Sequence, residues 1–266
     1  MLTVAFILST RRAGSTWLNV VLGSHSSTGS LGEYSRPFED RSHVACRLCE
    51  ANGLAECTVL SGIETVDADD AFTFASARMG KNILVECSKL IHWAERFIHR
   101  PDLDARLIHL VRHPCGYVES EMRRRPEVEP AVFIDEWVVQ NGWFDDFMAQ
   151  SGRPNYLVNY DALADAPLRE FPGLCEFIGF PFEPQALEYW NFEHHGLGGN
   201  GANSIYLQGR KVRKYITGDD AYYADLASHP IAADTRWRER LPAGVCVAAT
   251  SSNYARSMAH RLGVAW

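Results

Sequence analysis

The sequence lacks the features that mark membrane-spanning and nucleic-acid-binding proteins. No apolar run approaches the roughly 20 residues that a helix needs to cross a bilayer. The 26 Lys and Arg residues are outnumbered by 33 Asp and Glu residues, and the net charge of −7 argues against a broad nucleic-acid surface, which is normally basic. The first residues also lack the basic region, apolar stretch and cleavage site of a secretory leader. We therefore expect a soluble cytoplasmic protein with no membrane anchor and no nucleic-acid partner.

The first seventeen residues have the pattern of a strand, a loop and a helix that together bind an anion. The apolar run at residues 4–8 predicts a buried strand, and apolar residues recur on one helical face over residues 17–22. Gly14, Ser15 and Thr16 are therefore expected at a helix N-terminus, where free backbone N–H groups and the positive end of the helix dipole attract an anion.

This loop lacks the lysine of the nucleotide triphosphatase motif G-x-x-x-x-G-K-[ST]. Ser15 stands at the lysine position, and the cations Arg11 and Arg12 come before the glycine instead. Their guanidinium groups would then approach a phosphate from the loop and not from the first turn of the helix. The alternative is an ordinary strand-to-helix turn with two solvated arginines.

A second segment predicts a second anion site. The strand-like run at residues 106–111 is followed by Arg112, and Pro114 suits the first turn of a helix. Ser120 falls about one and two-thirds turns further along, which places its hydroxyl near Arg112. Two anion sites at the ends of two strands indicate a ligand with phosphates at both ends.

Strand and helix patterns alternate along most of the chain and predict an α/β fold. A single domain over residues 1–266 is expected, because 46% of the residues are hydrophobic and α/β folds of this length often form one unit. Right-handed crossovers would build a P-loop-like parallel sheet with helices on both faces. The expected strands are residues 3–9, 82–87, 106–111 and 155–159, and the expected helices lie near residues 15–24, 114–125, 130–150 and 167–178.

Residues 25–80 do not follow this alternation. They are expected to form an irregular, cysteine-containing insert over the strand ends, where ligands bind in open α/β sheets and where it would contribute to an acceptor site. Their spacing His43-x-x-Cys46-x-x-Cys49, with Cys57 eight positions later, could supply four tetrahedral ligands to a structural zinc ion. A disulfide among these cysteines and plain reduced thiols are equally open. Small core residues are expected at the other four cysteines, Cys87, Cys115, Cys175 and Cys246.

Taken together, these motifs resemble the sulfotransferases that use 3′-phosphoadenosine-5′-phosphosulfate (PAPS). Residues 12–18 (RAGSTWL) are similar to the family loop P-K-S-G-[ST]-[ST]-W-L, with arginine in place of lysine. Arg112-His113-Pro114 with Ser120 is similar to the family's R-x-P…S segment. Further similarities to bacterial members follow in order at residues 85–89 (VECSK), 159–163 (NYDAL) with Pro167, 195–200 (HGLGGN) and 236–241 (RWRERL).

The resemblance implies a set of donor-binding residues. The 5′-phosphosulfate side would comprise Arg11, Arg12, Ala13, Gly14, Ser15, Thr16 and Trp17; the 3′-phosphate side would comprise Arg112 and Ser120; and Gly199 and Asn200 would lie near the nucleotide. Arg12 stands where the family's lysine contacts the bridging oxygen. Because the pKa of arginine exceeds about 12, we expect Arg12 to stabilise the leaving group by its charge and not by donating a proton.

The resemblance also indicates a first candidate for the catalytic base. Glu33 follows Gly32, as in a Gly-Glu pair that faces the acceptor in many bacterial relatives, and is the first candidate. His92 is the second, because an imidazole has an ordinary pKa near 6.5. Lys89 is expected to approach the sulfate or the bridging oxygen as a second cation. Each of the three residues also has a structural alternative. Glu33 would be a surface carboxylate paired with Arg36, His92 would be a helix histidine hydrogen-bonded to a neighbour, and Lys89 would cap the end of a strand.

Two basic runs have competing interpretations. The favoured interpretation of the run at residues 123–125 is a solvated helix end. The alternative is that these arginines line a channel for an anionic substrate or for the 3′-phosphate. The run at residues 210–214 follows the glycine-rich segment, residues 196–201, so Arg210 and Lys211 are candidates for contact with the nucleotide.

The sequence thus favours a PAPS-dependent sulfotransferase that yields adenosine 3′,5′-bisphosphate and sulfates a small molecule or glycan. Two alternatives remain open. A P-loop kinase-like enzyme would need a lysine in the last turn of the loop and an acidic Mg²⁺ ligand. A non-catalytic nucleotide-binding module would keep the anion loops and lack a base.

Overall fold

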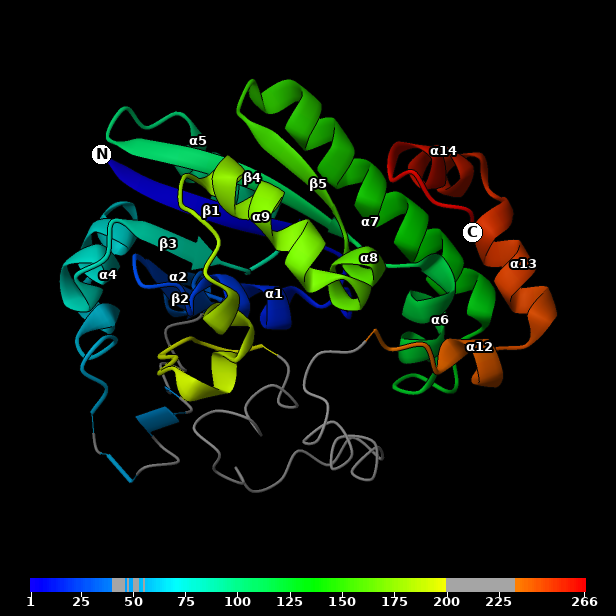
Figure 1. The fold of residues 1–266 in the computed structure, drawn as a ribbon, viewed down its shortest axis with the longest axis horizontal. Coiled ribbons are helices and arrows are strands. Elements are labelled where there is room, and N and C mark those ends of the chain that lie inside the picture. The colour runs from blue at the N-terminus through cyan, green and yellow to red at the C-terminus, as the bar shows by residue number, and fades with distance from the viewer. Residues whose placement is uncertain (40–45, 47, 50–52, 55, 200–232) are drawn as a thin grey trace.

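A five-stranded parallel sheet forms the centre of the protein in the computed structural model, which describes residues 1–39, 46, 48–49, 53–54, 56–199 and 233–266 (Figure 1). The strand order is β2-β3-β1-β4-β5, and all neighbouring strands are parallel. The strands are β1 (Leu2–Ser9), β2 (Thr28–Gly32), β3 (Ile83–Glu86), β4 (Leu103–Val111) and β5 (Asn155–Asn159).

Helices cover both faces of the sheet because the central strand β1 is apolar on both sides. Ala5 and Ile7 pack with α1 (Ser15–Leu22), α8 (Tyr160–Asp165) and α9 (Pro167–Ile178) on one face. Val4, Phe6 and Leu8 pack with α4 (Ala71–Met79), α5 (Ile91–Ile98) and α7 (Pro130–Ser151) on the other. A strand buried on both faces reads as a continuous hydrophobic run, as the sequence of β1 does.

A third apolar cluster joins the C-terminal helices to the carboxyl end of β4. It includes Tyr117, Trp137, Leu241 and Met258 from α6 (Pro114–Met122), α7, the end of α12 (Trp237–Arg240) and α14 (Asn253–Arg261). Figure 1 shows α13 (Ala243–Ser251) and α14 together at one end of the molecule, beside α6 and α7. The remaining described helical segments are α2 (Arg36–Glu39) and the 3₁₀ turns η1 (Ile63–Thr65), η2 (Ala68–Asp70), η3 (Pro184–Leu187) and η4 (Tyr189–Asn191).

The expected α/β architecture is confirmed, and the four expected strands and four expected helices are all present. The irregular insert is shorter than residues 25–80, because β2 forms the edge of the sheet near its start and α4 packs against the sheet at its end. The five residues of β2, TGSLG, lack the β-branched run by which strands are recognised, and tertiary burial of the whole segment decides its conformation.

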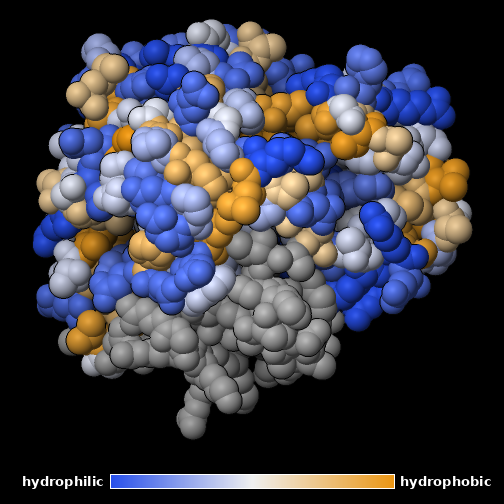
Figure 2. All heavy atoms as spheres, in the orientation of Figure 1, coloured by the Kyte–Doolittle hydropathy of each residue, from blue (hydrophilic) through white to orange (hydrophobic). Residues whose placement is uncertain are grey.

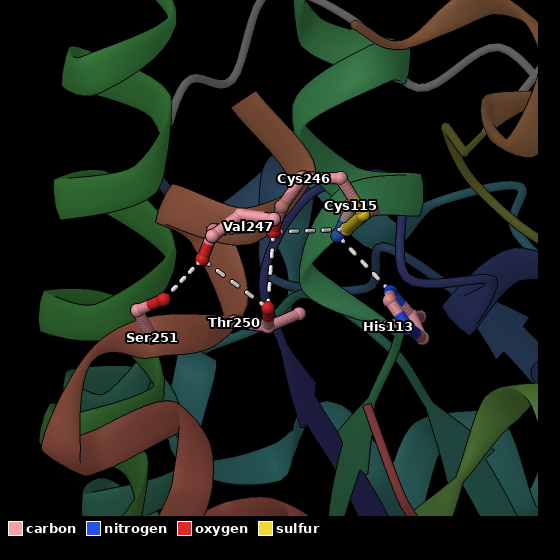
Figure 3. Close-up of a disulfide and its surroundings, with 6 residues drawn as sticks. All are labelled: His113, Cys115, Cys246, Val247, Thr250 and Ser251. Carbon is pink, nitrogen blue, oxygen red and sulfur yellow. Dashed lines mark hydrogen bonds between the residues drawn. A yellow bond between two sulfur atoms is a disulfide. The ribbon is translucent and has the colours of Figure 1, made fainter. Parts of the chain in front are cut away.

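Two cysteines that were expected as separate core residues form a disulfide. Cys115 at the start of α6 is bonded to Cys246 in α13, across 131 positions of sequence (Figure 3). The expectation was wrong here because each residue alone sits in an apolar or helical context, and sequence spacing does not reveal that the two helices pack together. Cys87 and Cys175 are free and buried, as expected.

No helix in the described part of the chain is long and apolar enough to cross a membrane. Hydrophobic and hydrophilic residues are interspersed over the face shown in Figure 2. The exposed large apolar side chains of the described residues include Leu168 and Trp143. Scattered exposed apolar residues of this kind are usual on folded proteins.

We expect reduction of the disulfide to lower the free energy of unfolding by about 2 to 5 kcal/mol, because the bond closes a long loop in the unfolded chain. Urea unfolding of the wild-type protein with and without a phosphine reductant measures the difference. Cys246→Ala should resemble the reduced wild type and ignore the reductant, whereas Cys175→Ala should still respond to it. A wild-type transition that the reductant leaves in place would contradict the bond.

Candidate active site

The loop between β1 and α1 has the geometry of an anion-binding turn, and together with the first residues of α1 (residues 10–16) we call it the phosphate loop after its predicted role. Gly14 precedes α1 with a left-handed backbone, φ +94°. A Cβ at this position would lie 2.4 Å from the ring of Tyr160, so glycine is required both by the backbone angle and by the close approach of α8. The first N–H groups of α1 lie at residues Ser15 to Leu18, and that of Leu18 already bonds to the Gly14 carbonyl at 3.0 Å.

The two expected anion sites are adjacent. Arg12 Nε donates to Ser120 Oγ at 2.9 Å, and Arg112 Nη1 donates to the Arg12 carbonyl oxygen at 2.9 Å. Arg12 belongs to the loop after β1, Arg112 follows β4, and β1 and β4 are neighbours in the sheet. The loop, Arg12, Ser120 and Arg112 therefore form one continuous surface at the carboxyl edge of the sheet, which we call the arginine corner.

A carboxylate is bound in the arginine corner. Asp234 Oδ2 lies 3.1 Å from Arg112 Nη2, and Arg236 Nε donates to Asp234 Oδ1 at 2.7 Å. Burial acts to raise the pKa of Asp234, but hydrogen bonding from Arg236 and attraction by Arg112 outweigh it and hold that pKa well below its usual value. Arg112 is itself 5% exposed and lies with Cζ 5.3 Å from the centre of the Tyr160 ring. Two guanidinium groups thus hold a pair of anionic oxygens at this point.

Glu33 and Lys89 form an ion pair beside the arginine corner. Lys89 Nζ lies 2.8 Å from Glu33 Oε1, and Arg36 Nε donates to Glu33 Oε2 at 2.6 Å. Burial acts to raise the pKa of Glu33, but Lys89 and then Arg36 outweigh it, so the pKa lies below its ordinary value of 4.5. The alternative pairing of Glu33 with Arg36 is also present, and both cations share the one carboxylate.

Two of the cationic residues at this edge have left-handed backbones. The φ angle of Arg12 is 63° and that of Lys89 is 66°, a region that residues with a Cβ seldom adopt. Arg12 follows β1 and Lys89 follows β3, the neighbouring strand. The backbone turns in the same way after both strands, and each turn presents a long cationic side chain.

The glycine-rich segment covers this edge of the sheet. Leu197 forms an isolated parallel bridge with Gly32, and its carbonyl oxygen accepts from Glu33 N at 2.7 Å. A Cβ on Gly198 would lie 2.6 Å from Glu33 Oε2, and one on Gly199 would lie 2.8 Å from Thr16 Cγ2. Both glycines have positive φ angles, of 60° and 83°. The segment therefore touches both Glu33 and the phosphate loop, and glycine allows that approach.

Three of the four predicted metal ligands lie together. Cys46, Cys49 and Cys57 are buried and free, and their sulfur atoms surround Nδ1 of His195. The ligand atoms of these four residues all lie within 4.8 Å of one another. His43, the expected fourth ligand, lies outside the described residues. His195 directly precedes the glycine-rich segment and lies about 140 positions after the cysteines in the chain, so local spacing could not indicate it.

Other predicted residues lie away from this site or outside the described part. His92 is on α5 with its side chain 69% exposed, and its Nε2 lies 2.8 Å from a carboxylate oxygen of Glu39. Arg11 is exposed. Arg123 pairs with Glu119 and Arg125 with Glu121 directly after α6, so these two arginines of the run are bound to carboxylates and are not simply solvated. Asn200, Arg210 and Lys211 fall in residues 200–232 and are not described.

Sequence reasoning missed three polar residues that support the site. Asn19 Nδ2 donates to the Val85 carbonyl, and its Oδ1 accepts from Gly32 N at 3.1 Å, which ties α1 to β3 and β2. Glu86 is buried at the end of β3; burial raises its pKa to about 7, and its Oε2 accepts from Ser88 N. Asp234 follows a long undescribed segment. In the sequence, these three polar side chains lie in or beside apolar runs. Because a buried amide or carboxylate normally has a hydrogen-bonding partner, their positions could have indicated a structural or functional role.

We expect the pairing of Glu33 to make stability depend on pH. A carboxyl whose pKa is lowered on folding stabilises the protein fully above its ordinary value of 4.5, and this contribution is lost as the pH falls through the lowered pKa. The difference in free energy of unfolding between wild type and Glu33→Gln should therefore be constant above the ordinary pKa value of 4.5 and should shrink steadily as the pH is lowered below it. Glu64→Gln, at an exposed position, should track the wild type throughout. A Glu33→Gln difference that is independent of pH would refute the lowered pKa.

Comparison with known proteins agrees with this architecture. The profile of the sulfotransferase family matches residues 5–184, which include the phosphate loop, Glu33, Lys89 and Arg112. Among solved structures, the sulfotransferase domain of the Synechococcus PCC 7002 olefin synthase aligns with a TM-score of 0.66 at 21% identity, over 99% of this chain and 95% of that domain. The sulfotransferase domain from the curacin biosynthetic pathway aligns with a TM-score of 0.61 at 19% identity, over 100% of this chain and 99% of that domain.

These structural similarities show a shared fold. Among curated protein sequences, none matches the chain. The family profile covers well over half of the 266 residues, including both strand ends from which the arginine corner is built. The chain therefore belongs to the sulfotransferase family.

Proposed function

We propose that the protein transfers the sulfuryl group of PAPS to a hydroxyl or amine of a small-molecule or glycan acceptor. The observation that carries this proposal is the continuity of the arginine corner, in which Arg12 connects the phosphate loop to Ser120 and its carbonyl oxygen binds Arg112. A donor with a phosphosulfate at one end and a 3′-phosphate at the other needs two anion sites that are this close. The glycine-rich segment and the Glu33–Lys89 pair border the same surface.

The 3′-phosphate is assigned to Arg112 and Ser120. The carboxylate of Asp234 is already held there by Arg112 and Arg236, which supports the binding of anionic oxygens at this point. A phosphate carries more negative charge than a carboxylate and has three terminal oxygens to accept from these donors. In this proposal the phosphate takes over the contact of Asp234 with Arg112.

The 5′-phosphosulfate is assigned to the N-terminus of α1 and to Arg12. Backbone N–H groups at Ser15 and Thr16 and the dipole of the helix favour an anion at this position. The permanent charge of Arg12 stabilises the negative charge that develops on the oxygen between phosphorus and sulfur as that bond breaks. Arg12 thereby contributes electrostatic stabilisation without transferring a proton.

Sulfuryl transfer then needs an attacking oxygen in line with the leaving group and a base for its proton. The acceptor oxygen forms a bond to sulfur, the bond from sulfur to the 5′-phosphate oxygen breaks, and adenosine 3′,5′-bisphosphate leaves. We assign the acceptor proton to the Glu33 carboxylate. Lys89 and Arg36 keep Glu33 ionised at neutral pH, and the proton becomes strongly acidic as the oxygen bonds to sulfur, so a base with a low pKa can accept it late in the reaction.

The donor assignment predicts discrimination between two nucleotides. Adenosine 3′,5′-bisphosphate should raise the melting temperature far more than adenosine 5′-monophosphate, because ligand binding to the folded state stabilises it by mass action. Arg112→Ala should cost the bisphosphate roughly 1.5 to 3 kcal/mol of binding free energy, as expected for a charge-assisted contact. Ser120→Ala tests the same corner with less risk to folding, and Arg124→Ala, at an exposed position, is the control. Equal shifts with both nucleotides would remove the 3′-phosphate site.

The assignment of the base predicts a separation of turnover from donor binding. Glu33→Gln should lower turnover by about 10²- to 10⁴-fold and leave the dissociation constant of adenosine 3′,5′-bisphosphate nearly unchanged. His92→Ala should keep both, because His92 is exposed and paired with Glu39. The assay uses radiolabelled PAPS with a panel of alcohols, phenols, amines and sugars. Normal turnover by Glu33→Gln together with loss in His92→Ala would transfer the role to His92, and nucleotide binding without turnover on any acceptor would indicate a binding module.

A further inference from the structure

The group formed by Cys46, Cys49, Cys57 and His195, which we call the Cys₃His cluster, has a geometry that hydrogen bonding does not explain. His195 Nδ1 lies 3.6 Å from Cys46 Sγ, 3.5 Å from Cys49 Sγ and 3.4 Å from Cys57 Sγ. A single ring nitrogen offers one hydrogen or one lone pair and cannot bond to three thiols at once. The three cysteine residues are only 3 to 7% exposed. Four polar atoms therefore converge on one buried point.

A tetrahedral metal ion accounts for these distances. With Zn–N near 2.05 Å and Zn–S near 2.3 Å at tetrahedral angles, the nitrogen-to-sulfur edge is about 3.6 Å. The three observed edges lie within about 0.2 Å of this value. The spacing Cys46-x-x-Cys49 is that of a common zinc-binding corner. The four ligand atoms also lie within 4.8 Å of one another, which leaves room for one ion and not for a cluster of several.

We propose that the Cys₃His cluster binds one structural Zn²⁺ ion. Three soft thiolates and an imidazole favour zinc over the hard cations Mg²⁺ and Ca²⁺, which prefer oxygen ligands. The Nε2 atom of His195 lies 3.7 Å from a carboxylate oxygen of Glu193, on the side where a carboxylate commonly orients a metal-bound imidazole. Four protein ligands complete the coordination shell, so the ion has no open position for substrate and acts on structure alone.

The ion would fix the glycine-rich segment in place. His195 is two positions before Leu197, which bridges to Gly32, and the following glycines touch Glu33 and Thr16. The cysteine ligands come from the insert, so the ion joins that insert to the segment covering the strand ends. This assignment of the metal is independent of the proposed function. Its expected effect on the affinity for adenosine 3′,5′-bisphosphate rests on the proposed function and is measured separately.

The first experiment measures the metal in the full-length protein, expressed with added zinc and purified under reducing, anaerobic conditions without a chelator. We expect about one zinc per chain by elemental analysis after gel filtration. Replacement of zinc by Co²⁺ should give the intense visible absorption of a tetrahedral cobalt thiolate site. The zinc content and the cobalt absorption are both measured on the wild-type protein, without an assay of activity.

The variants then assign the ligands. Cys57→Ser and His195→Asn should each lower the zinc content at least about fivefold after dialysis against a weak chelator. The controls Cys175→Ser and His260→Asn change a buried thiol and an exposed imidazole outside the cluster and should keep about one zinc per chain. If a cluster variant fails to fold, the wild-type cobalt spectrum still decides whether a thiolate-rich tetrahedral site exists.

Three results would overturn the proposal. They are a wild-type protein with negligible zinc and three reactive thiols or a disulfide in the cluster, bound iron in place of zinc, and zinc that persists unchanged in both cluster variants. Loss of zinc with retained affinity for adenosine 3′,5′-bisphosphate would contradict the positioning role. Failure of the nucleotide to bind a zinc-loaded wild-type protein would count against the proposed function and leave the metal site intact.

Discussion

The concentration of positive charge at one edge of the sheet is the constraint on which the site depends. Parallel pairing brings the ends of β3, β1 and β4 to the same edge, and each is followed within a few residues by a cation, Lys89, Arg12 or Arg112. Charges this close repel one another in a partly buried setting unless anions lie among them. Glu33 and Asp234 supply those anions, so this concentration of cations is balanced within the chain itself.

The sheet and its main helices could be predicted because they depend on local patterns. The doubly buried strand β1 is a continuous apolar run, and α9 begins and ends at the predicted residues 167 and 178. The strand β2 could not be predicted in this way. Its Gly and Ser residues have little preference for strands, and it is held by pairing to β3 and by the side chain of Asn19, which are contacts between distant segments.

In the candidate site too, the residues in local sequence patterns could be predicted, and those placed by contacts between distant segments could not. The phosphate loop, Arg112 and Ser120 each lie in a recognisable strand-to-helix pattern, and the structure brings them together. Their roles stay predictions, as do those of Glu33 and Lys89. The positions of His195 and Asp234 could not be derived, since each is brought to its partners by the path of the whole chain. The disulfide escaped prediction for the same reason.

The left-handed backbones of Arg12 and Lys89 have a consequence for how the protein tolerates change. A residue with a Cβ in this conformation costs on the order of 1 kcal/mol, which the surrounding fold must offset. Glycine at either position would relieve that strain and would also remove the charge. A substitution that only relieves the backbone would therefore remove a cation that the proposed function requires. At these two strand ends backbone strain and the proposed function make opposite demands on the sequence.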